Sequence, residues 1–187
     1  MKRMALLLVI TICPAALAAQ GTVVVPEPAL DAGRATLRDQ LLRFRDTLNG
    51  IDAAAARLQR DYRAASGAAL SSRARVMTDA CARSGRNVLP ARRAVLAADA
   101  SDSGRIKSRT QLLRALDQLR VVLSRCEADF AALSRPGQEE NVRGYGNDRA
   151  VRVQGALRRY EQVLAGFFNA MGIKVSPLGA SAHPAVG

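Results

Sequence analysis

The three cysteines are the residues whose type and spacing point most directly to a chemical role. Cys13 lies in an apolar N-terminal run, whereas Cys81 and Cys126 lie in the body of the chain. Neither of these two belongs to a Cys-x-x-Cys or Cys-x-x-Cys-His motif, which argues against redox catalysis and c-type haem. Cleavage of the N-terminal run as a signal peptide would remove Cys13, and the even pair of cysteines that remains in an exported chain is typical of disulfide bonding. We therefore predict one structural disulfide between Cys81 and Cys126.

Other side chains offer little for catalysis. The one histidine, His183, lies beside a proline near the C-terminus, and the adjacent Glu139 and Glu140 would point apart on a helix or a strand. Met77 and Met171 lie at core positions of helical repeats, where methionine usually fills gaps rather than binding haem. The sequence has no serine-hydrolase, zinc-peptidase, phosphate-binding-loop or EF-hand motif. We expect no catalytic residue, no cofactor and no metal ligand, and a protein that is not an enzyme.

The chain is strongly basic, with 28 Lys and Arg against 16 Asp and Glu and a formal net charge of +12. All of these basic residues are arginines except Lys2, Lys107 and Lys174. Two interpretations stay open. The arginines form a solvated surface of mixed charge, or they bind anionic surfaces and polymers such as lipid headgroups, lipopolysaccharide or nucleic acid. No specific nucleic-acid motif accompanies them.

The N-terminus has the pattern of a secretory signal peptide over residues 1–19. Lys2 and Arg3 precede an apolar run that ends in small residues, and cleavage is expected before Ala19 or Gln20. That run is shorter than the roughly 20 apolar residues of a membrane span. No second run of that length follows, so we expect no transmembrane helix in the mature chain. The protein is expected to be periplasmic or secreted; the alternative is a membrane tether formed by an uncleaved N-terminal segment.

Four stretches repeat apolar residues at alternating steps of four and three, the pattern of helices packed lengthwise as in coiled coils. These core heptad positions are Leu37, Leu41, Phe44, Leu48, Ile51, Ala55, Leu58 and Tyr62; Leu70, Ala74, Met77, Cys81, Ser84 and Val88; Leu112, Leu116, Leu119, Leu123, Cys126, Phe130 and Leu133; and Val153, Leu157, Tyr160, Leu164, Phe167 and Met171. A content of 4% aromatic residues also favours helices over a β-sandwich. We predict helices over about 33–65, 69–98, 105–134 and 147–171.

Proline and polar residues mark further boundaries. We expect a kink or a break in the second helix near 85–90, because Pro90 inside a helix costs roughly 3 kcal/mol. Residues 138–146 are expected to form a loop, after which Asn147 or Asp148 would cap the last helix. The predicted organisation is a signal peptide over 1–19, an N-terminal lead over 20–32, a helical domain over 33–172 and a mobile tail over 173–187.

Most connections between the predicted helices are too short to join anything but antiparallel neighbours. The sequence therefore predicts an all-α, antiparallel up-down four-helix bundle with coiled-coil-like heptad packing. Residues at one level of an antiparallel hairpin have numbers with a constant sum, so pairing Cys81 with Cys126 places the turn at Ser103 and Gly104. Facing Cα atoms of packed helices lie roughly 5.4 Å apart, close to the roughly 5.5–6 Å of disulfides. An inter-helix disulfide thus fits the predicted bundle.

These observations predict an exported, non-catalytic helical-bundle protein with a structural or protein-interaction role in the cell envelope, acting on an unidentified envelope protein. The alternative is a binder of anionic surfaces or polymers through its arginine-rich surface. Salt separates the two, because binding to a polyanion weakens steeply as the ionic strength rises. The sequence does not indicate an oligomeric state.

Overall fold

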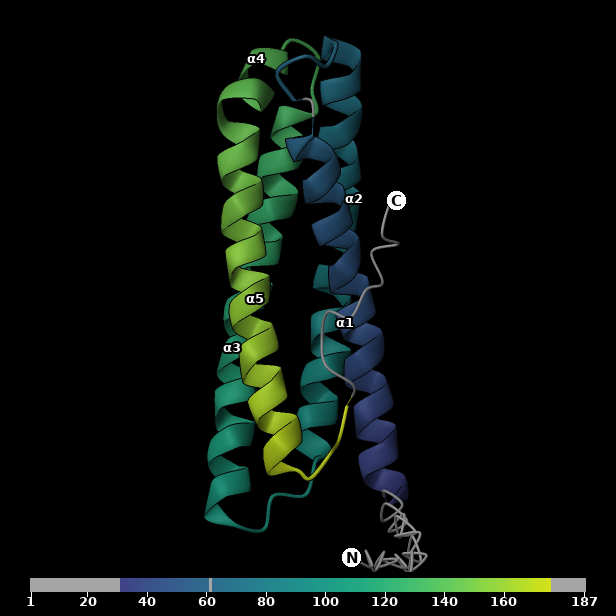
Figure 1. Ribbon diagram of the computed structural model, residues 1–187, viewed down its shortest axis with the longest axis vertical. Helices are drawn as coiled ribbons and strands as arrows, with labels where there is room; N and C mark the ends of the chain where they lie inside the picture. The colour runs from purple at the N-terminus through teal and green to yellow at the C-terminus, as the bar shows by residue number, and fades with distance from the viewer. Residues whose placement is uncertain (1–30, 61, 176–187) are drawn as a thin grey trace, which may run out of the picture.

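The computed structural model describes residues 31–60 and 62–175. Within this part of the chain the elements are α1 (Ala32–Gln59), α2 (Gly67–Ala97), α3 (Ser103–Leu133), the short α4 (Glu139–Asn141), the π-helical turn η1 (Val142–Gly146) and α5 (Asn147–Ala170). The four long helices lie side by side and alternate in direction, with α4 at one end (Figure 1). Contacts join α1 to α2, α2 to α3, α3 to α5 and α5 to α1, which closes a ring of four. The predicted all-α, antiparallel four-helix bundle is confirmed, whereas the predicted signal peptide over 1–19 lies outside the described residues.

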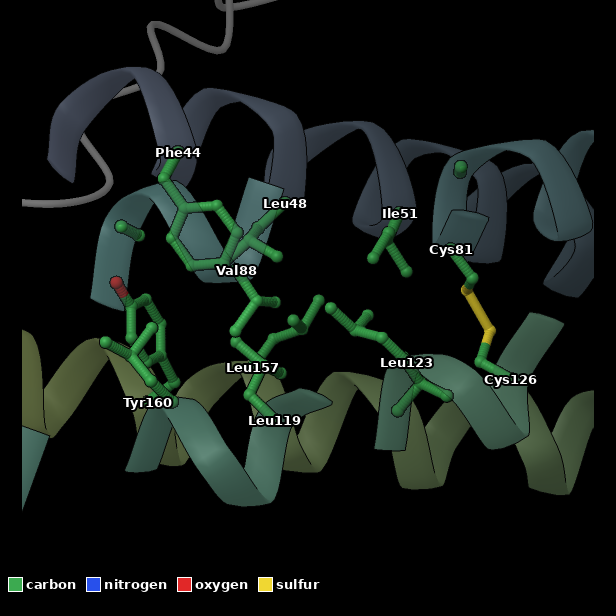
Figure 2. Close-up of a cluster of buried hydrophobic side chains, with 14 of the residues drawn as sticks. Phe44, Leu48, Ile51, Cys81, Val88, Leu119, Leu123, Cys126, Leu157 and Tyr160 are labelled. Atoms are coloured by element: carbon green, nitrogen blue, oxygen red, sulfur yellow. A yellow bond between two sulfur atoms is a disulfide. The ribbon is translucent and has the colours of Figure 1, made fainter. Parts of the chain in front are cut away.

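The core heptad positions fill the centre of this ring. All of them are buried except Tyr62, which is partly buried and packs against the core. Figure 2 shows side chains from all four long helices converging, among them Leu119 of α3 and Leu157 of α5. Ser84 is a polar residue buried at a core heptad position, and its hydroxyl donates to the Thr47 carbonyl oxygen of α1 at 3.0 Å. That bond satisfies a hydroxyl that would otherwise be costly to bury.

Short polar side chains begin three of the long helices. Asp31, Ser66 and Asp102 are the N-caps of α1, α2 and α3, and each accepts a hydrogen bond from the backbone N–H three residues on, at 2.8, 3.3 and 2.8 Å. Such caps satisfy backbone donors that have no partner inside the helix. The predicted cap of the last helix at Asn147 or Asp148 is wrong. The chain enters α5 from η1 with helical backbone angles, so no side-chain cap forms there.

Helix α2 runs through Pro90 as a single helix, so the predicted break near 85–90 is wrong. The alternation of four and three continues beyond Val88 through Ala91 and Val95, and all three residues are buried. Pro90 itself lies on the exposed side of the helix. Water can therefore reach the carbonyl that proline leaves without its helical N–H partner. The apolar burial gained by continuing the packing outweighs the local penalty.

The connections at the α4 end also differ from the prediction. Residues 138–146, predicted as a loop, are largely helical as α4 and η1, because Val142 turns into the core and is 1% exposed. Helix α1 ends at Gln59 rather than near residue 65. Beyond it the backbone of Arg60 is extended, and its carbonyl accepts a hydrogen bond from the Arg73 side chain at 2.8 Å. Side-chain donors thus replace the helical bonds that further turns of α1 would have made.

The end of α5 has the geometry of a glycine C-cap. Gly172 has a φ of +67°, a left-handed conformation that glycine adopts without strain. The N–H of Ile173 then donates to the Phe168 carbonyl oxygen at 2.8 Å, as in a Schellman motif. Ile173 is only 1% exposed, so the predicted mobile tail over 173–187 is wrong for its first residue. Residues 176–187 lie outside the described residues.

Candidate functional site

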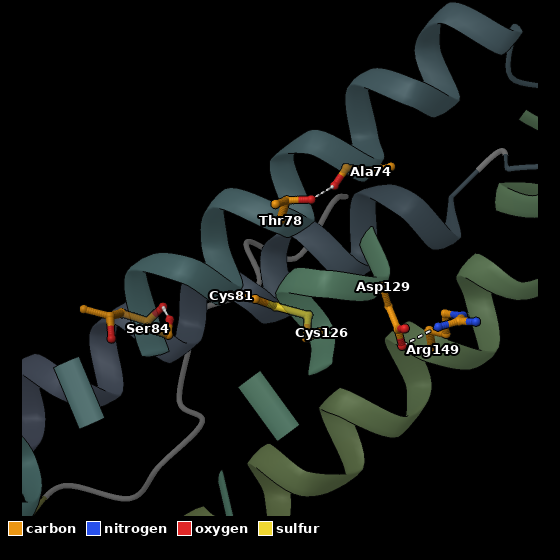
Figure 3. The surroundings of a disulfide bond; sticks show 8 residues. Ala74, Thr78, Cys81, Ser84, Cys126, Asp129 and Arg149 are labelled. Atoms are coloured by element: carbon orange, nitrogen blue, oxygen red, sulfur yellow. Dashed lines mark hydrogen bonds and ion pairs between the residues drawn. A yellow bond between two sulfur atoms is a disulfide. The ribbon is translucent and has the colours of Figure 1, made fainter. Parts of the chain in front are cut away.

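The predicted disulfide between Cys81 and Cys126 joins α2 to α3 inside the core (Figure 3). Its two Cα atoms lie 6.0 Å apart, in the range expected for facing heptad positions. The two residues are 0% and 3% exposed. Exchange requires a thiolate to reach one of the sulfur atoms, and burial prevents that approach. The pairing predicted from the sequence is confirmed.

A groove beside the disulfide lies between α3 and α5 and has a volume of about 480 Å³. Five arginines line this arginine groove: Arg125, Arg149, Arg152, Arg158 and Arg159. One acidic residue, Asp129, also lines it, so the groove has an excess of four positive charges. Apolar contacts are offered by Val122, Cys126, Phe130, Val151 and Val153. Guanidinium groups gathered over an apolar surface favour the binding of anions with planar or forked oxygen pairs.

One ion pair holds the two walls of the arginine groove together. Arg149 of α5 pairs with Asp129 of α3 (Figure 3). Within the residues that the structure describes, Arg125, Arg152 and Arg159 take part in no ion pair, and all three are exposed. These three guanidinium groups are therefore available to a bound anion.

A second polar site, the α1–α5 polar cluster, consists of Asp52, Gln59, Gln154, Arg158 and Glu161. The Gln59 amide donates to Gln154 Oε1 at 3.1 Å, and Gln154 is hydrogen-bonded to Asp52. Partial burial raises the pKa of the Asp52 carboxyl, against the opposing effects of Gln154 and Arg158. Partial burial and the charge of Asp52 raise the pKa of Glu161, against nearby arginines. The two carboxyl groups therefore bind protons more readily in the folded chain than in water.

Two buried polar atoms lie in the helices of the same interface. The Tyr160 hydroxyl and the Arg45 Nε have no hydrogen-bond partner among the described residues. Tyr160 packs edge-on against Phe44 of α1, with ring centroids 5.7 Å apart. Burial raises the pKa of the Tyr160 phenol well above its ordinary value, so the group stays neutral. A neutral and inaccessible phenol offers neither a nucleophile nor a base.

Arg143 of η1 holds the connection that follows α1. Its guanidinium donates to the backbone carbonyl oxygens of Tyr62, Arg63 and Ala65 at 3.3, 2.7 and 2.8 Å, and pairs with Glu140 at 3.3 Å. This role could not be predicted from the sequence because the partners are backbone atoms about 80 residues away, as expected where a side chain satisfies a turn. A lone arginine in a segment predicted as a loop gives no signal of such a contact.

The other residues considered for catalysis are placed apart from one another. Met77 and Met171 are buried in the core at 0% and 2% exposure. The Glu139 carboxylate accepts a hydrogen bond from the Gly137 N–H at 3.4 Å, whereas Glu140 pairs with an arginine as described above. The two glutamates thus serve different partners. His183 lies outside the described residues.

Neither a metal-binding cluster nor a membrane-spanning helix is found in residues 31–60 and 62–175. No three His, Cys, Asp or Glu side chains come together there as metal ligands would, and no helix there combines the length and hydropathy of a membrane span. Comparisons with protein-family models, curated proteins and solved structures found no match. Function is therefore inferred from the chain's own residues.

Proposed function

We propose that this chain is an exported, non-catalytic interaction module of the cell envelope. The observation that carries the proposal is the separation of apolar side chains in the interior from charged side chains on the surface. The heptad positions fill one continuous core that includes the Cys81–Cys126 bond, while charged side chains cover the outer faces. A preorganised bundle of this kind loses little conformational entropy when a partner binds to a helix face. The sequence pattern of residues 1–19 and the disulfide both support an exported protein.

Photo-crosslinking in the producing cells tests this proposal. A photoreactive amino acid replaces, one at a time, the exposed residues Leu96 of α2, Val121 of α3 and Val151 of α5. We expect the processed chain in the envelope fraction and one adduct of defined mass from at least one face. The same substitution at buried Met77 is the control and should give no adduct. Absence of adducts from all three faces, or an unprocessed chain in the cytoplasm, would contradict the proposal.

The arginine groove favours a second function, the binding of anionic surfaces. Its excess of four positive charges is concentrated along one side of the bundle rather than balanced by acidic neighbours. Electrostatic binding of this kind weakens steeply between low and moderate salt. Flat, weak binding of the mature chain to anionic vesicles and to nucleic acid over that salt range would exclude the second function.

A further inference from the structure

We infer that the arginine groove binds the phosphate group of an anionic lipid. The inference rests on the second proposed function, the binding of anionic surfaces, and gives it a site and a ligand. The groove between α3 and α5 has a volume of about 480 Å³. Ligand sites commonly have volumes of several hundred cubic ångströms, so a lipid headgroup and the adjoining part of an acyl chain fit this space.

The polar part of the groove suits an anion that offers pairs of oxygen atoms as hydrogen-bond acceptors. Arg152 and Arg159 lie two helical turns apart on the same side of α5, about 10 Å along its axis, and Arg125 faces them from α3. All three are exposed and lie outside the ion pairs of the described residues. Guanidinium groups donate two parallel hydrogen bonds to the oxygens of a phosphate. An entering phosphate therefore gains these contacts without breaking an internal ion pair.

The remaining charges of the groove are already engaged. The Asp129 carboxylate would repel an anion, but the Arg149 guanidinium pairs with it. Arg158 is also exposed and outside the ion pairs of the described residues, but it interacts electrostatically with Asp52 and Glu161 of the α1–α5 polar cluster. Anion binding thus depends on the three exposed arginines named above.

The apolar part of the groove favours a lipid over a nucleic acid. Val122 and Val151 line it beside the arginines, and Val151 is 46% exposed. Phe130 also lines the groove, but it is 0% exposed and presents no ring face. Proteins hold single-stranded nucleic acids largely by stacking bases on exposed aromatic rings. Exposed valines instead match the apolar portion of a lipid.

Vesicle flotation of the mature, disulfide-bonded chain tests the inference, and it suits a protein without tryptophan. The vesicles contain phosphatidylcholine alone or with phosphatidylglycerol, and free glycerol phosphate serves as a soluble competitor. The test variant is Arg152→Gln/Arg159→Gln. The control, Arg86→Gln/Arg93→Gln, removes two exposed arginines at the same spacing from α2, outside the groove. Circular dichroism shows whether each variant keeps the helical content of the parent chain.

We expect binding only to vesicles that contain phosphatidylglycerol. The groove variant should lose about tenfold in affinity, because two charge-assisted hydrogen-bonding groups are removed. The control should lose less than about twofold, as expected for exposed charges remote from the ligand. Arg152→Lys/Arg159→Lys keeps the positive charges but loses the paired N–H donors of the guanidinium groups. Its affinity should therefore fall between those of the parent chain and the glutamine variant.

Several outcomes would overturn the inference, and they separate it from the functions proposed above. Equal losses in the groove and control variants, or full affinity of the lysine variant, would mean general charge attraction, which leaves the second proposed function standing. Full competition by glycerol phosphate would assign the groove to soluble phosphates. Tighter binding of an oligonucleotide that depends on Arg152 and Arg159 would assign it to nucleic acid. No binding by any form would remove the second function as well, whereas photo-crosslinking from Leu96 and Val121, which lie outside the groove, tests the envelope interaction independently.

Discussion

Helices α2 and α3 meet through apolar heptad residues, a covalent bond and the Arg92–Asp117 ion pair at 2.9 Å, whereas α1 and α5 meet in part around the partly buried carboxyl groups of Asp52 and Glu161. The first pair is joined by the buried Cys81–Cys126 disulfide and by a short turn. The second pair consists of the first and last long helices of the sequence. Where these helices meet, the carboxyl groups of Asp52 and Glu161 have raised pKa values. Local stability is rarely uniform within a domain. We expect the bundle to open first between α1 and α5, and the following changes test that difference.

The largest expected effect comes from removing the covalent bond of the stronger pair. Cys81→Ala/Cys126→Ala should lower the free energy of unfolding by about 4 kcal/mol, because the bond closes a loop of roughly 45 residues in the unfolded chain. Chemical denaturation followed by circular dichroism measures the change. Helical content should persist, since the heptad residues remain. An unchanged midpoint, or two reactive thiols in the unreduced parent chain, would contradict this prediction.

The second effect concerns Arg143, which connects η1, just before α5, to the turn after α1. Arg143→Ala should lower the stability by about 2 kcal/mol, because three backbone carbonyls lose a charged donor. Native-state hydrogen exchange should show faster exchange at the end of α1 than in α2 and α3. Arg135→Ala, at an exposed position in the α3–α4 connection, is the control and should change neither quantity. Uniform acceleration over all helices would argue against a weaker α1–α5 edge.

A smaller effect of opposite sign is expected at Tyr160. Tyr160→Phe removes a buried hydroxyl that has no hydrogen-bond partner among the described residues, while the edge-on contact with Phe44 is kept. The free energy of unfolding should rise by about 1 kcal/mol. Tyr145→Phe, at a residue that is 59% exposed, is the control and should leave it unchanged. A destabilised Tyr160→Phe variant would show that the hydroxyl is satisfied in solution.

The smallest effect depends on pH. A raised carboxyl pKa means that the folded chain binds the proton more tightly than the unfolded chain, so ionised Asp52 and Glu161 destabilise the fold. This cost is fully present above the two raised pKa values and is relieved as the pH falls through them. Asp52→Asn/Glu161→Gln should therefore stabilise the chain at pH 7, by less than about 1 kcal/mol because both groups are partly solvated.

Denaturation at a series of pH values measures this dependence. The advantage of Asp52→Asn/Glu161→Gln should shrink as the pH falls from 7 toward the ordinary carboxyl range near about 4. Asp79→Asn, on the exposed face of α2, is the matched control and should show no such advantage at pH 7. An advantage that stays constant over the whole range would mean that side-chain ionisation is not its cause.

The long-range architecture could be predicted because the heptad spacing is a property of the whole chain. The pairing of Cys81 with Cys126 followed from the same register. The break predicted at Pro90 is wrong because the penalty of the proline is local, whereas the spacing that continues through Ala91 and Val95 decides which residues are buried. The packing of a complete helix thus outweighs the local cost of one proline.

The candidate site could not be predicted in the same way. Arginines occur on every long helix, and the heptad pattern does not tell which of them converge once α3 packs on α5. Arg125 and Arg159 belong to segments more than 30 residues apart, and only the rotation of both helices brings them to one groove. The same holds for Asp52 and Gln154, which come from the first and last long helices. These sites depend on inter-helix geometry rather than on local sequence.

The disulfide also determines how the chain would respond to a pulling force. Because Cys81 and Cys126 are covalently joined, the 45-residue separation between them is excluded from any extension applied through the two ends. At roughly 3.4 Å per residue, about 150 Å of contour length stays hidden even after the helices have come apart. A bundle held by its ends between envelope components would therefore have a fixed maximum reach. Proteolysis in the exposed turn between α2 and α3 would likewise leave the two fragments linked.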